Sequence, residues 1–325
     1  MKDTRARRDI LRATMLVAIS ACCFGSISPL TVLALKSGVA LQGIQALRYT
    51  TTAVLLVLYA AWRPSPIHPA AARARDFDAA PWYSWRVLLI AGGGQASVAT
   101  LSLLSLRWIP ASTAAFLFYT YPAWVAIMTA VRGVEPLGRV RVVALLLALG
   151  GIGAMVGAPS AASLNATGVV VILLGALVYA GYIPVLSSLQ RTRAPLDVAR
   201  AISVGGAILF LAWALATGTL LAHHDARSVA ASMLQGVLSA GAFLGFLAGL
   251  AQLGAVRTAI TSTIEPFWTT LMGVLVLGQP IGGGTLVGGA GIMAAVLLLQ
   301  RPNVALRPLH SSSSHEGDQP GRPTH

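Results

Sequence analysis

The chain has 325 residues, of which 56% are apolar and only 10% are charged, and its mean hydropathy is +0.74. Charged residues make up about a quarter of an ordinary soluble domain, so this composition excludes a soluble globular protein. The formal net charge of +13 raises the question of nucleic-acid binding. That function needs a basic patch on a folded surface, and the sequence offers none, so it is excluded as well.

Apolar segments long enough to cross a bilayer recur along the chain. A membrane-spanning helix needs about 20 consecutive, mainly apolar residues. In chain order, we expect ten such helices, over residues 13–35, 43–62, 86–106, 111–131, 142–158, 168–189, 198–222, 232–253, 258–278 and 285–299. The predicted fold class is therefore an all-α polytopic membrane protein with ten transmembrane helices.

The basic residues are distributed unevenly among the segments that join these helices. If both termini are cytoplasmic, every Lys and Arg of the 23 lies in a cytoplasmic segment except Lys36, Arg48, Arg107 and Arg227. Cytoplasmic enrichment of Lys and Arg sets the orientation in which a membrane protein inserts. The pattern therefore predicts that the N- and C-termini both face the cytoplasm.

The two halves of the chain share a pattern. Tyr121-Pro122-Ala123-Trp124 is matched 144 positions later by Glu265-Pro266-Phe267-Trp268. Three further matches relate Phe24-Gly25 to Tyr179-Ala180, Arg48 to Arg200, and Gly151-Ile152 to Gly291-Ile292. Such matches predict an internal duplication, and five helices in each half, an odd number, would place the second half upside down in the membrane.

This duplication predicts a division of the chain into four parts. They are an N-terminal cytoplasmic tail at 1–12, a first five-helix repeat at 13–158, an inverted second repeat at 168–299, and a disordered cytoplasmic tail at 300–325. The last segment is polar and carries Pro and Gly, a composition that is typical of disorder.

Several motifs together resemble those of the EamA-type transporters in the drug/metabolite transporter superfamily. They are Phe24-Gly25, Ala46-Leu47-Arg48-Tyr49, the block from Pro122 to Glu135 before Gly150-Gly151, and the block from Glu265-Pro266 to Gln279. The resemblance covers residues 12–300 and implies two inverted five-helix repeats around a central cavity. It also implies transport of small metabolites or drugs. Members usually carry glutamate at both block ends, whereas here the second block ends at Gln279.

Glu265 is the acidic residue predicted to lie deepest in a membrane helix, since the other acids fall in tails, loops or helix ends. A charge there costs about 2.5–3.5 kcal/mol on insertion scales, so Glu265 should face the bundle interior or a wet cavity. We interpret it as a proton carrier or as a site for a cationic group. The alternative is a structural carboxylate that pairs with a neighbouring helix.

Residues around Glu265 share its spacing on a helix. Thr258, Thr261, Glu265, Trp268 and Met272 are separated by three, four, three and four positions, which places them on one face. The matching face in the first half contains Tyr121 and Trp124. Two such faces across a pore would suit an amphipathic, cationic ligand. The alternative is ordinary helix packing, for which Trp and Met are also typical.

Proline and arginine residues inside the predicted helices are further candidates. Mid-span prolines remove a backbone hydrogen bond, so Pro29, Pro122, Pro184 and Pro266 are hinge candidates, although proline is common in membrane helices. Arg48 could bind a carboxylate and form a zwitterion site with Glu265. Its position near a helix end favours instead an interfacial arginine that snorkels outward or fixes a loop.

These observations predict a secondary transporter that moves a small metabolite or drug-like molecule across the cytoplasmic (inner) membrane by alternating access. Export is the expected direction, and proton coupling through Glu265 and facilitated diffusion are both compatible with the sequence. The expected partners are a small-molecule substrate, the lipid bilayer and protons, with no nucleic acid. The alternatives are a non-transporting membrane scaffold or sensor and a membrane-embedded enzyme.

Enzymatic activity would need a nucleophile with a base, or a metal pair, inside the helices. The sequence has no Gly-x-Ser-x-Gly or His-Glu-x-x-His motif, and all six histidines lie outside the predicted helices. It has no Walker loop for ATP either. We therefore expect no enzyme activity, no metal and no cofactor.

Overall fold

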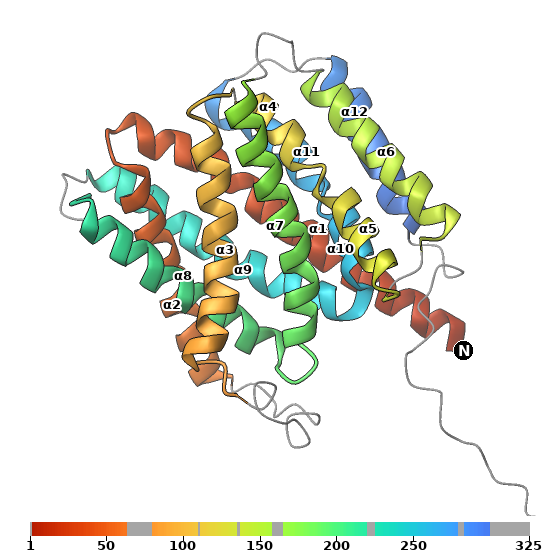
Figure 1. The fold of residues 1–325 in the computed structure, drawn as a ribbon, viewed down its shortest axis with the longest axis horizontal. Coiled ribbons are helices and arrows are strands. Elements are labelled where there is room, and N and C mark those ends of the chain that lie inside the picture. Colours follow the sequence, from red (N-terminus) through yellow and green to blue (C-terminus); the bar gives the residue numbers. More distant parts are fainter. Residues whose placement is uncertain are drawn as a thin grey trace, which may run out of the picture.

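The computed structural model describes residues 2–63, 80–109, 111–134, 137–157, 165–219, 225–278 and 283–299. These residues form a bundle of twelve α-helices, with no strand among them (Figure 1). The helices are α1 (Lys2–Lys36), α2 (Leu41–Trp62), α3 (Trp85–Ser105), α4 (Ala111–Phe118), α5 (Tyr121–Val131), α6 (Arg139–Val156), α7 (Ala166–Leu189), α8 (Pro195–Ala216), α9 (Ala226–Leu253), α10 (Ala255–Thr261), α11 (Ile264–Leu277) and α12 (Gly283–Leu299).

The helices follow the predicted segments closely, with three differences. Two predicted helices, 111–131 and 258–278, are each divided into a pair, α4 with α5 and α10 with α11. Helix α1 begins at Lys2, so most of the segment expected to be an N-terminal tail is already helical. The expected disordered tail at 300–325 lies outside the described residues, as do the block ends Glu135 and Gln279.

Seven stretches of the described chain are long and apolar enough to cross a membrane. They are Arg7–Leu35, Leu41–Trp62, Trp85–Ser105, Thr113–Val131, Ala166–Leu189, Pro195–Ala216 and Ala226–Leu253, and a shorter apolar helix follows at Gly283–Leu299. Many large apolar side chains on these helices are exposed, as is expected of surfaces that face lipid rather than water.

Two of the four candidate hinge prolines begin helices instead of interrupting them. Pro122 lies in the first turn of α5, and Pro266 lies in the first turn of α11. Proline is well accommodated there, because the first N–H groups of a helix have no intrahelical partner to lose. Pro29 and Pro184 lie inside α1 and α7, as predicted from the sequence. Pro122 and Pro266 therefore each follow a helix break and remove no hydrogen bond within a continuous helix, and their role as hinges stays a prediction.

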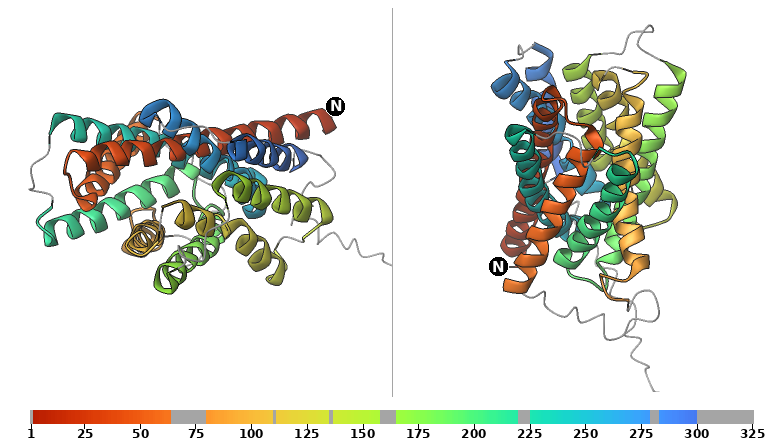
Figure 2. Two further views of the ribbon diagram at one scale, coloured as in Figure 1. Left: turned by 90° about the horizontal axis from the view of Figure 1, so that it is seen from above. Right: turned by 90° about the vertical axis from the view of Figure 1, so that its left-hand side faces the viewer.

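Helices of one half of the chain lie mainly against helices of the other half. The most extensive contacts join α1 to α9, α6 to α12, α2 to α8 and α3 to α7. Helices α6 and α12 run side by side at one edge of the bundle (Figure 1). Two further views show α1 on the opposite side of the bundle from α3 and α7 (Figure 2). The middle of the bundle is therefore enclosed by both halves.

Glycine residues permit the closest of these helix contacts. A Cβ atom added to Gly151 in α6 would lie 2.6 Å from the backbone oxygen of Gly288 in α12. A Cβ atom added to Gly92 in α3 would lie 2.4 Å from the backbone carbon of Gly205 in α8. Helices in membranes associate largely through close packing of small residues, so these contacts fix the positions of α3, α6, α8 and α12.

Candidate functional site

A cavity of about 180 Å³ lies in the middle of the bundle. Its lining comes from both halves of the chain and is mainly aromatic and aliphatic, with four polar residues. The apolar residues are Phe24, Ile27, Val98, Phe118, Tyr179, Leu186, Ile202, Phe243 and Phe246, and the polar residues are Ser28, Arg48, Gln95 and Glu265. Apolar cavities with a few convergent polar groups are typical of sites for small organic molecules.

Glu265 lies in the first turn of α11, directly after the break that separates this helix from α10. The N-terminus of a helix carries a partial positive charge, which stabilises a carboxylate in that position. The hydroxyl group of Tyr119, in the break between α4 and α5, lies near the Glu265 carboxylate and interacts with it electrostatically. The two helix breaks therefore meet at this carboxylate, which is partly exposed to the cavity.

Helix α1 approaches α11 closely at the level of Glu265. A Cβ atom added to Gly25 would lie 2.8 Å from the backbone oxygen of Glu265. Thr269, one turn further along α11, donates a hydrogen bond from Oγ1 to the backbone oxygen of Gly25 at 3.0 Å. Phe24 of the same turn and Glu265 both line the cavity, so this contact brings two lining segments together.

Arg48 is buried in α2, with 8% of its surface exposed, and it lines the cavity. Its Nε donates a hydrogen bond to Ser239 Oγ in α9 at 2.8 Å, and its Nη1 donates to Gln45 Oε1 at 3.4 Å. The guanidinium carbon also lies 5.0 Å from the centre of the Tyr49 ring. The interpretation of Arg48 as a snorkelling interfacial arginine is therefore wrong, because α2 turns this face toward α9 and the cavity.

Arg48 and Glu265 face the same cavity without forming a direct ion pair, although both lie in the described part of the chain. Their opposite charges attract each other across the space between them. An electrostatic attraction acts more strongly in a low-dielectric interior than in water. The arrangement can therefore hold a ligand that carries a positive group toward Glu265 and a negative group toward Arg48.

Tyr121 does not line this cavity but lies behind its aromatic lining. The residue is fully buried, and its hydroxyl donates a hydrogen bond to the backbone oxygen of Ala259 in α10 at 3.3 Å. Its ring meets the ring of Tyr179 edge-on, with 4.7 Å between their centres. Tyr121 therefore supports Tyr179, which does line the cavity, and ties α5 to α10.

The structure places the other three predicted pathway residues outside the cavity lining. Trp124 is 38% exposed on α5, and Thr261 is buried as the last residue of α10. Trp268 donates a hydrogen bond from Nε1 to Ser26 Oγ in α1 at 2.8 Å, so it joins two helices. The predicted common face assumed continuous helices, whereas a break changes the direction in which residues on either side point.

Several residues of the site were not singled out from the sequence. Tyr119 lies near Glu265, Ser239 accepts a hydrogen bond from Arg48, and Phe118, Phe243 and Phe246 supply much of the aromatic lining. One signal was available for Ser239, because Ser232, Gln235 and Ser239 repeat at three and four positions and so predict a polar face on α9. No comparable pattern marks Tyr119, which lies where the helix breaks.

Comparisons with known proteins found a family match in the second half of the chain. Residues 166–301 match the model of the EamA-like transporter family. The second half of the chain is therefore similar to an EamA-like transporter domain. This matched segment contributes Tyr179, Ser239 and Glu265 to the site.

The fold also has counterparts among solved structures. One crystal structure of a protein matches with a TM-score of 0.65 and 17% sequence identity, over 86% of this chain and 95% of the other. At this identity the likeness concerns the fold alone. No curated protein matches the sequence.

Within the described ranges, no group of three His, Cys, Asp or Glu side chains is placed to hold a metal ion.

Proposed function

We propose that this protein is a proton-coupled secondary transporter that exports a small organic molecule across the cytoplasmic membrane by alternating access. The observation that carries the proposal is the placement of Arg48 and Glu265 on one aromatic cavity between the two halves of the chain. A membrane scaffold or sensor, the other class predicted from the sequence, has no evident use for two opposite charges facing an internal cavity.

The architecture proposed for this activity is ten membrane crossings in two inverted five-helix repeats, with both termini in the cytoplasm. In this scheme, α4 with α5 and α10 with α11 each form one crossing. Exchanging α1 with α7, α2 with α8, α3 with α9, α5 with α11 and α6 with α12 turns each of the most extensive helix contacts either into itself, as for α6 with α12 and α2 with α8, or into another observed contact. For example, the contact of α1 with α11 becomes that of α7 with α5. This correspondence supports the repeat, and the distribution of basic residues supports the orientation.

The substrate class follows from the cavity lining. A molecule with an ammonium group would interact with Glu265, and a carboxylate on the same molecule would interact with Arg48. The rings of Phe24, Phe118 and Phe243 would contact an apolar or aromatic side group. We therefore propose a small amphipathic zwitterion as the transported molecule, within the broader class of metabolites and drug-like compounds.

Proton coupling is proposed through Glu265. The carboxylate lies at the break between α10 and α11, where a change in its charge acts directly on the junction of two helices. A proton and the positive group of the substrate would compete for the same carboxylate, so one could drive the release of the other. Pro122 and Pro266, each in the first turn after a break, stay hinge candidates in this cycle.

The proposal is tested by reconstituting the protein in liposomes and measuring export of zwitterionic amino compounds under an imposed pH gradient. Glu265→Gln should abolish the response to the gradient, and Arg48→Gln should weaken transport of zwitterions. Asp225→Asn is the matched control, because it makes the same acid-to-amide change outside the cavity, at the N-cap of α9. Transport that survives Glu265→Gln with its full gradient response overturns the proton-carrier role.

A further inference from the structure

Arg48 is held from two directions by groups that carry no charge. Ser239, which is 0% exposed, accepts the hydrogen bond of Nε from α9, and Gln45 accepts that of Nη1 from one turn earlier in α2. The guanidinium group of arginine is planar, so a hydrogen bond at Nε fixes the plane of the whole group. These contacts orient the cation but leave its charge uncompensated.

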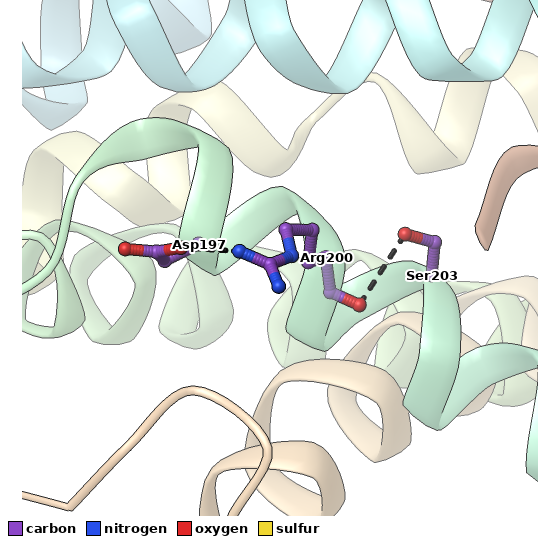
Figure 3. Close-up of polar contacts among 3 residues, drawn as sticks. All are labelled: Asp197, Arg200 and Ser203. Atoms are coloured by element: carbon purple, nitrogen blue, oxygen red, sulfur yellow. Dashed lines mark hydrogen bonds and ion pairs between the residues drawn. The ribbon is translucent and has the colours of Figure 1, made fainter. Parts of the chain in front are cut away.

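The corresponding arginine in the second half has a different environment. Arg200 lies 152 positions after Arg48, and Asp197 lies 152 positions after Gln45. Arg200 donates from Nη1 to Asp197 Oδ1 at 3.0 Å, as Figure 3 shows, and its guanidinium carbon lies 3.9 Å from the centre of the Trp82 ring. The charge of Arg200 is therefore balanced within its own helix.

One difference between the two sites is the chemical group that lies three positions before the arginine. A residue three positions before the arginine accepts a hydrogen bond in both, but it is a neutral amide in Gln45 and a carboxylate in Asp197. An arginine already paired with a carboxylate has less attraction to offer a second anion. The amide at Gln45 thus keeps Arg48 available to a negative group in the cavity.

We propose that Gln45 and Ser239 are positioning residues that make Arg48 a selective site for the carboxylate of the transported molecule. Ser239 occupies Nε, which leaves the Nη end of the guanidinium group to bind the carboxylate. Gln45 supplies an acceptor without supplying a competing charge. This inference rests on the proposed function and adds the residues that give the cavity its preference for an anionic group.

The alternative is that Ser239 serves only in helix packing, and the chain offers a matched control for that role. Ser232 lies two turns earlier on the same face of α9 and is also 0% exposed. Its hydroxyl donates to the backbone oxygen of Ser228 in its own helix at 2.8 Å. Ser232→Ala should therefore reproduce any loss of stability that comes from removing a buried hydroxyl on this helix face.

The test is equilibrium binding to the purified full-length protein in detergent, with two probes. Phenylalanine carries both charges and an aromatic ring, and phenethylamine is the same molecule without the carboxylate. The preference of the wild type for phenylalanine should fall about tenfold in Ser239→Ala, since a hydrogen bond to a charged group is lost. It should fall further in Gln45→Glu. Phenethylamine binding should change less than twofold in both, and Ser232→Ala should leave both probes unaffected.

If the wild type binds phenylalanine no better than phenethylamine, this inference and the proposed zwitterionic substrate are both wrong. The remaining outcomes separate the inference from the proposed function. If Arg48→Gln removes the preference but Ser239→Ala and Gln45→Glu retain it, the positioning roles are wrong and the proposed function stands. If Arg48→Gln also retains it, the role of Arg48 in the proposed function fails. Thermal unfolding of each variant shows that it is folded.

Discussion

The hydroxyl group of Tyr121 donates a hydrogen bond to the backbone oxygen of Ala259 at 3.3 Å and so connects the two helix breaks. Ala259 lies in the last turn of α10, where the next backbone N–H groups turn to other acceptors: Thr263 donates to Ile260. Buried carbonyl groups at helix ends need a partner. The first-half counterpart of Glu265 therefore stabilises the junction, while Glu265 itself faces the cavity.

Removing this hydroxyl should lower the stability of the protein. We expect Tyr121→Phe to reduce the free energy of unfolding by about 1–3 kcal/mol, because a buried carbonyl loses its hydrogen bond. Thermal unfolding in detergent measures the change. Tyr59→Phe is the control, since Tyr59 is exposed on α2. Equal unfolding temperatures for the two variants would contradict the prediction.

Tyr119 should affect ligand binding more than stability. Its hydroxyl is a polar neighbour of Glu265, so Tyr119→Phe leaves the carboxylate less firmly oriented. We expect phenethylamine to bind about tenfold more weakly, which corresponds to the loss of one polar contact to a charged group. Tyr83→Phe, at an exposed position, provides the control. A Tyr119→Phe variant with wild-type affinity would show that this contact does not matter for binding.

Adjacent glycines in α6 should respond differently to the same substitution. In Gly151→Ala the new Cβ would clash with the backbone of α12, which cannot shift without disturbing its own packing. We therefore expect the free energy of unfolding to fall by about 1–3 kcal/mol. In Gly150→Ala the Cβ enters open space, and stability should be unchanged or slightly higher. Thermal unfolding measures the stability of both variants, and similar losses of stability would argue against the close contact of α6 with α12.

Trp268 should behave as a packing residue, although the sequence pattern placed it in the transport pathway. Its indole N–H donates to Ser26, so Trp268→Phe and Ser26→Ala each remove the same hydrogen bond. We expect each to lower stability, with a double variant less destabilised than the sum of the two. Binding of phenylalanine should change less than twofold. A tenfold loss of phenylalanine affinity in Ser26→Ala would instead indicate that Trp268 contributes to ligand binding.

The proposed orientation predicts that the C-terminus lies on the cytoplasmic side of the membrane. An epitope tag placed after residue 325 should stay protected from antibody in intact cells and become accessible once the membrane is permeabilised. The basic segments next to the helices are the physical reason, because they are retained on the cytoplasmic side. A tag that is labelled in intact cells would rule out the proposed topology.

The positions of the apolar helices followed from the sequence, because they depend on local composition, whereas the inverted repeat of the two halves stays a prediction. An apolar run of sufficient length partitions into the bilayer regardless of its neighbours, and a repeated Pro-x-Trp pattern is visible without a fold. Glu265 was found in the same way, since an acid within an apolar run must face the interior. The structure places it on the cavity.

The faces of the helices were decided by their packing in three dimensions. Arg48 reaches the cavity because α2 lies against α9, and Trp124 and Trp268 point elsewhere because α4–α5 and α10–α11 are broken before their prolines. A spacing of three and four residues identifies a common face only while one helix continues. Where a helix breaks, its direction depends on contacts with distant segments, such as that between Tyr121 and Ala259, which no local pattern encodes.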